Sequence, residues 1–169
     1  MSKDHIILTG FMGSGKTSVG QLLAHKLNLP FVDLDHLIEQ DEGRSIREIF
    51  QTQGEETFRK LESKAIHKAL AEPRSVIATG GGALMIEENT RLLKQRGQMV
   101  YLQAEPETLW ERVQWNDDRP LLEKHSTLEA FSSLLQSRIP NYKQSHFIID
   151  VDHLTLEEVA LCIMELVAE

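Results

Sequence analysis

A glycine-rich turn between an apolar run and an amphipathic segment constrains this chain more than any other feature. The stretch GFMGSGKTS contains Gly10, Gly15, Lys16 and Thr17 in the pattern G-x-x-x-x-G-K-[ST]. In such a P-loop, backbone N–H groups wrap a phosphate chain, while the lysine and the hydroxyl reach the phosphates and Mg²⁺. The apolar run HIILT precedes the turn and helical spacing follows it. Strand, loop and helix thus come in the order that phosphate binding requires, which a glycine turn beside a surface lysine does not explain.

Composition and charge exclude several classes of protein. The 169 residues predict one domain whose core needs no disulfide or metal clip. Asp and Glu outnumber Lys and Arg by 26 to 18, and this formal net charge of −8 disfavours a nucleic-acid partner. The single cysteine, Cys162, lies in the apolar run VALCIMELV and is interpreted as a core residue. No membrane span or signal-peptide pattern is present, so we expect a cytoplasmic protein with no membrane partner.

Short apolar runs alternate with segments of helical periodicity along the chain. This alternation predicts an α/β domain with a parallel sheet flanked by helices. The segment at 115–127, WNDDRPLLEKHST, loses the helical pattern and gathers Asn, Asp and Pro, so we expect a mobile lid there. The expected strands are 5–9, 31–34, 75–79, 98–102 and 146–151, and the expected helices lie near 16–27, 45–70, 87–96, 105–114, 128–144 and 155–167.

Two aspartates follow the second expected strand, where parallel α/β sheets bind their ligands. Asp33 and Asp35 stand two residues apart in FVDLDHL and initially point to the same side. One carboxylate can hold Mg²⁺ through water, while the other orients a substrate hydroxyl and accepts its proton. The alternative is that Asp35 only caps a short helix at 36–40. The P-loop one strand away favours the functional interpretation.

Three glycines, Gly80, Gly81 and Gly82, directly follow the third expected strand. Successive glycines leave backbone N–H groups unshielded, as a small anion or a polyol would need. A plain tight turn needs only one or two glycines, but a turn stays open as the alternative. The hydrophobic strand ending in Asp that often accompanies a P-loop is absent from this position.

Several arginines say little when each is taken alone. Arg59 and Glu62 are three apart in ETFRKLESK and can pair on one helix face, and most such pairs are solvated surface contacts. Arg112 and Arg138 are by themselves ordinary residues of solvated helices. Arg119 differs, because an arginine at the centre of a lid can deliver positive charge to a transferring phosphoryl group on closure.

Taken together, these motifs resemble the shikimate kinase family. The resemblance rests on GFMGSGKTSVG, DLD at 33–35, FRKLE at 58–62, ATGGG ending at Gly82, and RPLL at 119–122, in the family's order along the whole chain. It implies a nucleoside-monophosphate-kinase-like P-loop fold, a three-layer sandwich with a five-stranded parallel sheet and a closing lid. It also implies a commonly monomeric enzyme that uses ATP to phosphorylate the 3-hydroxyl of shikimate, in the aromatic amino-acid pathway.

The resemblance also implies roles for individual residues. Arg59 and Arg138 would bind the carboxylate of shikimate, and Arg112 would stack on adenine. The expected catalytic residues are Asp35 as the candidate base, with Lys16 and Arg119 neutralising phosphoryl charge. The expected substrate-binding residues are Asp35, Phe58, Arg59, Glu62, Gly80, Gly81, Gly82 and Arg138. The expected ATP-binding residues are Gly13, Ser14, Gly15, Lys16, Thr17, Ser18, Arg112, Arg119 and His153, and the expected Mg²⁺ ligands are Thr17 and Asp33.

Two alternatives stay open at this point. Another small-molecule kinase of the same fold, such as a gluconate or nucleoside-monophosphate kinase, would share the P-loop, but a monophosphate acceptor would call for more arginines. A nucleotide-binding module without turnover would have lost Asp35, Arg59, Arg119 or Arg138, and none is lost. The loop DVDHLTLEE around His153 departs from the family pattern, because some members offer arginine and proline to the adenine there.

Overall fold

A parallel sheet organises the computed structural model, which describes residues 5–114 and 120–168. The strands follow the order β2-β3-β1-β4-β5, and every neighbouring pair is parallel. The predicted α/β fold with a five-stranded parallel sheet is therefore confirmed. The strands are β1 (His5–Thr9), β2 (Phe31–Asp33), β3 (Val76–Ala78), β4 (Gly97–Gln103) and β5 (Phe147–Asp150).

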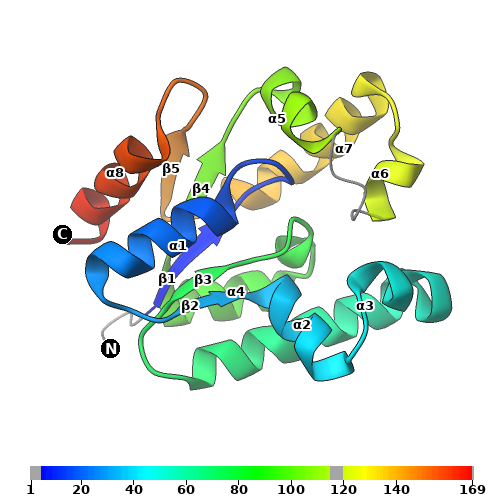
Figure 1. Ribbon diagram of the computed structural model, residues 1–169, viewed down its shortest axis with the longest axis horizontal. Coiled ribbons are helices and arrows are strands. Elements are labelled where there is room, and N and C mark those ends of the chain that lie inside the picture. The colour runs from blue at the N-terminus through cyan, green and yellow to red at the C-terminus, as the bar shows by residue number, and fades with distance from the viewer. Residues whose placement is uncertain (1–4, 115–119, 169) are drawn as a thin grey trace.

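Strand β1 lies at the centre of the sheet because it is apolar on both faces. Ile6, Ile7 and Leu8 are each 0% exposed, and Ile6 stands opposite Val76 of β3 and Gln98 of β4. Strands covered on both faces require such a continuous apolar run. Since all five strands point the same way, the loops after them meet at one edge of the sheet (Figure 1).

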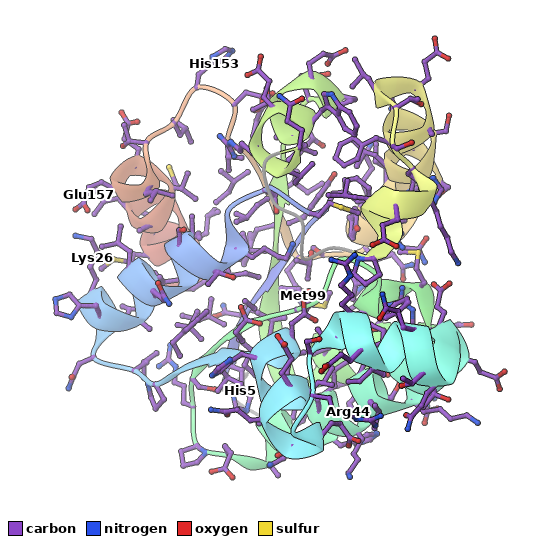
Figure 2. The ribbon with its side chains drawn as sticks, turned by 45° about the vertical axis from the view of Figure 1, so that its right-hand side comes forward. His5, Lys26, Arg44, Met99, His153 and Glu157 are labelled. Carbon is purple, nitrogen blue, oxygen red and sulfur yellow. The ribbon has the colours of Figure 1, made fainter. Side chains whose placement is uncertain are left out.

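Helices lie on both sides of the sheet (Figure 1). In that view α1 and α8 lie side by side in front of it, where Lys26 and Glu157 form an ion pair that joins them (Figure 2), and α4 lies behind it. The helices are α1 (Lys16–Leu27), α2 (Leu34–Glu42), α3 (Ile46–Ala71), the 3₁₀ turn η1 (Ala83–Met85), α4 (Glu87–Arg96), α5 (Pro106–Val113), α6 (Pro120–Lys124), α7 (Leu128–Tyr142) and α8 (Leu156–Ala168). No helix in the two described ranges is long and apolar enough to cross a membrane.

Helix α2 begins immediately after β2, with Asp33 as its N-cap. One carboxylate oxygen of Asp33 accepts hydrogen bonds from the backbone N–H groups of Asp35, at 3.0 Å, and His36, at 3.3 Å. The capping role that the sequence offered as the alternative for Asp35 therefore belongs to Asp33. Asp35 lies inside the first turn of α2, because the helix begins two residues earlier than the pattern indicated.

Helix α3 covers the expected helix at 45–70 but bends at Gly54. The backbone there has φ 80° and ψ 172°, a conformation that only glycine adopts readily. A methyl group at Gly54 would meet nothing within 4 Å, so conformation and not space requires glycine. The bend brings the two halves of the helix together, with the rings of Phe50 and Phe58 at a centroid distance of 4.8 Å.

The expected lid at 115–127 is described only in part. Residues 115–119, which include Arg119, lie outside the described residues. Contrary to the expected loss of helical structure, α6 forms within this segment, with proline at the first position where a helix tolerates it best. Glu123 of α6 forms an ion pair with Arg47 of α3 at 2.9 Å. That the segment closes as a lid stays a prediction.

A tight contact between β4 and β1 gives a test of the packing. Gly97 begins β4, and a Cβ there would lie 2.8 Å from the His5 carbonyl oxygen and 2.5 Å from Cδ1 of Ile7. We expect Gly97→Ala to lower the free energy of unfolding by about 1–3 kcal/mol, the usual cost of overpacking. Urea unfolding followed by circular dichroism measures it. Gln98→Ala, at the next position of the strand, is the control, and an equal loss there would contradict the steric explanation.

Candidate functional site

Two adjoining cavities open at the carboxyl edge of the sheet. The larger has a volume of about 340 Å³ and the smaller, the P-loop cavity, about 190 Å³. Asp35 and Gly81 line both cavities, so these residues form the wall between them. The larger cavity is lined by Met12, Asp35, Glu39, Ser45, Ile46, Arg47, Phe50, Phe58, Arg59, Glu62, Gly80, Gly81, Gly82, Pro120 and Arg138. The P-loop cavity is lined by Gly13, Gly15, Lys16, Thr17, Ser18, Asp33, Asp35, Thr79 and Gly81.

The P-loop cavity is built by the turn between β1 and α1. Gly10, Gly13 and Gly15 have φ angles of 147°, 85° and 92°, which residues with a Cβ rarely adopt. Helix α1 begins at Lys16, and its N-cap Gly15 supplies no side-chain hydrogen bond. The first N–H groups of the helix therefore face the cavity with the positive end of the helix dipole, which suits an anion.

Two cationic side chains lie against the same turn. The Lys16 ammonium donates hydrogen bonds to the carbonyl oxygens of Gly10, at 2.7 Å, and Phe11, at 3.1 Å. The Arg112 guanidinium of α5 donates to the carbonyl oxygen of Gly13 at 3.1 Å. Two positive charges thus contact the phosphate-binding turn, as a polyphosphate chain would require.

Thr17 and Asp33 face each other across the P-loop cavity. The Thr17 hydroxyl donates to Oδ2 of Asp33 at 2.8 Å, while Oδ1 of Asp33 caps α2. A hydroxyl and a carboxylate beside a phosphate site are the ligands with which Mg²⁺ usually binds, together with phosphate oxygens and water. The pair therefore fits the predicted Mg²⁺ site, with a carboxylate that its capping bonds hold in place.

The glycine run after β3 makes room for charged side chains. A Cβ at Gly80 would lie 2.6 Å from Oε2 of Glu62 and 3.0 Å from Oδ1 of Asp35. A Cβ at Gly82 would lie 2.5 Å from both terminal nitrogens of Arg59. Neither glycine has a positive φ, so space and not conformation requires them. A plain turn would not need this space, so the run forms part of the site.

The Arg59–Glu62 pair is buried, not a solvated surface contact. Nη1 of Arg59 contacts Oε1 of Glu62 at 2.9 Å, and their side chains are 16% and 1% exposed. Nη2 of Arg59 contacts the more exposed Glu55 at 3.2 Å. Oε2 of Glu62 is buried without a hydrogen-bond partner in the described part of the chain. Burial raises the pKa of the Glu62 carboxyl, Arg59 opposes this, and the nearby Asp35 adds to the rise.

Arg138 reaches the larger cavity from α7. The residue is 5% exposed, and its guanidinium carbon lies 5.6 Å from the centroid of the Phe11 ring. Its Nη1 is buried and has no hydrogen-bond partner among the described residues. Arg59 and Arg138 thus place two guanidinium groups on the wall of one cavity, an arrangement that suits a carboxylate ligand.

The structure brings most of the predicted site residues together, while His153 lies elsewhere. It is exposed in the loop between β5 and α8, and Figure 2 shows its side chain pointing away from the body of the molecule. Arg119 lies outside the described residues. The predicted residues that line the two cavities are Gly13, Gly15, Lys16, Thr17, Ser18, Asp33, Asp35, Phe58, Arg59, Glu62, Gly80, Gly81, Gly82 and Arg138. Ser14 of the P-loop is buried beside them.

Sequence reasoning missed the wall that the start of α3 contributes. Ser45, Ile46, Arg47 and Phe50 line the larger cavity, as does Glu39 of α2. Their spacing indicated only a helix, and the bend at Gly54 brings them back toward the glycine run. The glycine inside a long helical pattern was the one signal in the sequence.

Comparison with known proteins decides the family. The sequence model of the shikimate kinase family matches residues 12–168. The chain belongs to the shikimate kinase family. The shikimate kinase of Symbiobacterium thermophilum is 45% identical over 168 residues, covering 98% of this chain and 97% of that protein. The shikimate kinase of Thermodesulfovibrio yellowstonii is 45% identical over 156 residues, covering 92% of this chain and 90% of that protein.

A solved structure agrees with these relatives. The shikimate kinase from Acinetobacter baumannii in complex with shikimate has a TM-score of 0.94 and 36% sequence identity, covering 99% of this chain and 94% of that one. The predicted resemblance to shikimate kinase is therefore confirmed, together with the P-loop fold. As a member of this family the chain is an enzyme of the transferase class, and shikimate phosphorylation is the activity that its relatives support.

The pKa of Glu62 gives a pH-dependent prediction. Because the native pKa is raised above the ordinary value of 4.5, the folded protein keeps this proton where the unfolded chain has lost it. Stability then falls as the pH rises through that range. Gln at this position cannot ionise, so its own contribution to stability does not change with pH in this range. We expect the free energy of unfolding of Glu62→Gln, taken relative to that of the wild type, to increase as the pH rises from 4.5 toward neutrality.

Urea unfolding at several pH values measures this difference. Glu55→Gln is the matched control, because Glu55 pairs with the same arginine but its side chain is 45% exposed. An exposed pair contributes about 0–1 kcal/mol, so its loss should have little effect. A difference between Glu62→Gln and the wild type that does not change with pH would contradict the raised pKa.

Proposed function

We propose that this chain transfers the γ-phosphoryl group of ATP to the 3-hydroxyl of shikimate, giving ADP and shikimate 3-phosphate. The observation that carries the proposal is the pair of cavities that share Asp35 and Gly81. One is walled by a phosphate-binding turn and the other by two arginines. A donor and an acceptor bound in them would meet at the shared wall. The shikimate bound to the Acinetobacter baumannii relative supports shikimate as the acceptor.

The larger cavity has the groups that shikimate requires. Its carboxylate would bind the guanidinium groups of Arg59 and Arg138, since planar guanidinium forks match carboxylates. Its hydroxyls would face Asp35 and the backbone of the glycine run. Phe58 would supply an apolar wall, and it packs its ring 5.3 Å from the guanidinium carbon of Arg59. Glu62 would hold Arg59 in position through their contact at 2.9 Å.

The P-loop cavity would take the phosphates of ATP. The N–H groups from Gly13 to Ser18 would wrap the phosphate chain, and Lys16 would exchange its bonds to loop carbonyl oxygens for phosphate oxygens. Arg112, already seated on the loop, would extend toward the adenine. Arg119 and His153 keep their predicted roles at the transferring phosphoryl group and the nucleotide, which rest on the family resemblance.

Thr17 and Asp33 would hold Mg²⁺ beside the phosphates. When bound there, Mg²⁺ would neutralise negative charge on the β- and γ-phosphates. The Thr17 hydroxyl already lies 2.8 Å from the Asp33 carboxylate, so both oxygens face one small region of the cavity. The capping bonds of Asp33 to the start of α2 keep its carboxylate from turning away.

Asp35 would orient the 3-hydroxyl toward the γ-phosphorus and accept its proton. In the transfer, the hydroxyl oxygen bonds to the γ-phosphorus, the bond from that phosphorus to the bridging oxygen breaks, and ADP leaves. Phosphoryl transfer usually has a loose transition state, so catalysis rests mainly on positioning and on charge neutralisation. Lys16 and Arg119 would supply the neutralising charge.

An ADP-release assay with Mg·ATP and a panel of acceptors tests the proposal. The panel contains shikimate, gluconate, AMP and water alone, which covers the alternative kinases of this fold. We expect ADP release that depends on shikimate. Release that depends on gluconate or AMP would overturn the substrate, and no acceptor-dependent release would favour a nucleotide-binding module without turnover.

Lys16 provides a sharp test of the phosphate site. We expect Lys16→Ala to lower kcat by about 100-fold or more, because a preorganised charge that stabilises the transition state is lost. Circular dichroism checks that the fold is intact. Lys26→Ala is the matched control, because Lys26 lies on the same helix and pairs with Glu157, away from the cavity. Near-normal turnover in Lys16→Ala would refute the role.

Arg59 tests the carboxylate site. We expect Arg59→Ala to raise the KM for shikimate about 10-fold or more with a smaller change in the KM for ATP, since charged hydrogen bonds to the acceptor are lost. Lys60→Ala is the control, because the neighbouring Lys60 side chain is 77% exposed. An unchanged KM for shikimate in Arg59→Ala would remove Arg59 from the acceptor site.

A further inference from the structure

The hydroxyl of Tyr142 joins two parts of the larger cavity that come from distant elements. It donates a hydrogen bond to the backbone carbonyl of Gly81, in the glycine run. The Arg138 guanidinium, four residues earlier on α7, lies close enough to lower the pKa of this hydroxyl against the effect of burial, and a Cβ at Gly81 would lie 3.5 Å from its Nη1. One buried hydroxyl therefore lies beside a cavity arginine and bonds to the loop that lines both cavities.

Arg138 has buried neighbours on two sides. The Phe11 ring lies 5.6 Å from its guanidinium carbon, and the Tyr142 hydroxyl lies beside the guanidinium. A guanidinium group carries five N–H donors in a rigid plane, so neighbours that restrict this plane restrict all five. Its buried Nη1 is left without a partner among the described residues, and a Cβ at Gly81 would lie 3.5 Å from that atom. Tyr142, which is bonded to Gly81, thus restricts where this donor points.

The environment of Tyr142 suits a fixed neutral hydroxyl. The residue is 1% exposed, and its ring packs on that of Tyr101 at a centroid distance of 5.1 Å. Burial raises the pKa of Tyr142 well above its usual range. The hydroxyl therefore keeps, at any physiological pH, the proton that it donates to Gly81.

We propose that Tyr142 is a positioning residue for acceptor binding, which acts by fixing the Arg138 guanidinium relative to the backbone of Gly81. This inference rests on the proposed function, because it takes Arg138 to bind the acceptor carboxylate. Tyr142 does not line either cavity in the described residues. Its effect on the acceptor therefore passes through Arg138.

Tyr142→Phe tests the proposal, because it keeps the ring and its stacking while removing the hydroxyl. We expect the KM for shikimate to rise about 10-fold, because the bond that holds Gly81 beside the Arg138 guanidinium is lost, while kcat and the KM for ATP change less than threefold. A merely structural role would lower the fraction of active enzyme, and hence kcat, with an unchanged KM. Urea unfolding shows whether the assayed variant is folded.

Two control variants separate Tyr142 from its surroundings. Tyr101→Phe removes the hydroxyl of the stacking partner, and Asn141→Ala removes the hydrogen bond that Asn141 donates to the Leu84 carbonyl at 3.0 Å. The second control weakens the docking of the same helix end near the same loop without touching Arg138. We expect the KM for shikimate to stay within twofold of wild type in both. An equal rise in Asn141→Ala would assign the effect to helix docking and overturn the proposal.

A double variant tests whether Tyr142 acts through the arginine. In an Arg138→Ala background, Tyr142→Phe should raise the KM for shikimate less than twofold further. Full additivity, or an unchanged KM in Tyr142→Phe alone, would overturn the proposal. The same series measures the activity of the wild type with shikimate and the expected rise of the KM for shikimate in Arg138→Ala. Failure of either would count against the proposed function, whereas the coupling between the two residues concerns Tyr142 alone.

Discussion

The hydrogen bonding of β1 between β3 and β4 is the constraint on which the site depends. Leu8 pairs in register with Ala78 on one side and with Val100 on the other. The turn after β1 and the glycine run after β3 therefore emerge beside each other, and the backbone N–H of Thr79 donates to the carbonyl of Leu8 at 3.0 Å. The phosphate-binding turn and the glycine run of the acceptor cavity are neighbours because the two parallel strands that precede them end side by side.

The absence of side chains on the glycine run lets charge concentrate there. Glu62 and Asp35 crowd the space that a Cβ at Gly80 would need, and Arg59 crowds the space that a Cβ at Gly82 would need. Such crowding has a cost, since Oε2 of Glu62 is left buried and unpaired among the described residues. Groups whose hydrogen bonds are incomplete in the protein can complete them with a ligand. The unpaired oxygen therefore lowers the stability of the fold but is available for ligand binding.

The acceptor wall is assembled from elements that are remote in sequence. The bend at Gly54 returns the start of α3 toward the glycine run, and α7 brings Arg138 and Tyr142 from the other side. Each arginine has a buried supporting neighbour: Glu62 contacts Arg59 at 2.9 Å, and Tyr142, bonded to Gly81, lies beside Arg138. Supporting contacts of this kind keep long side chains in one orientation before the ligand arrives.

The sequence by itself determined the local structures and the residue types of the phosphate site. The order of strand, glycine turn and helix, and the alternation of five apolar runs with helical segments, depend on neighbours along the chain, so spacing alone reveals them. It could not decide whether Arg59 and Glu62 were solvated, which aspartate caps α2, or which group the Tyr142 hydroxyl bonds to. Burial and contacts across α2, α3, α7 and the glycine run settled these points, because desolvation and hydrogen-bond partners depend on residues far away in sequence and only the tertiary structure brings those together.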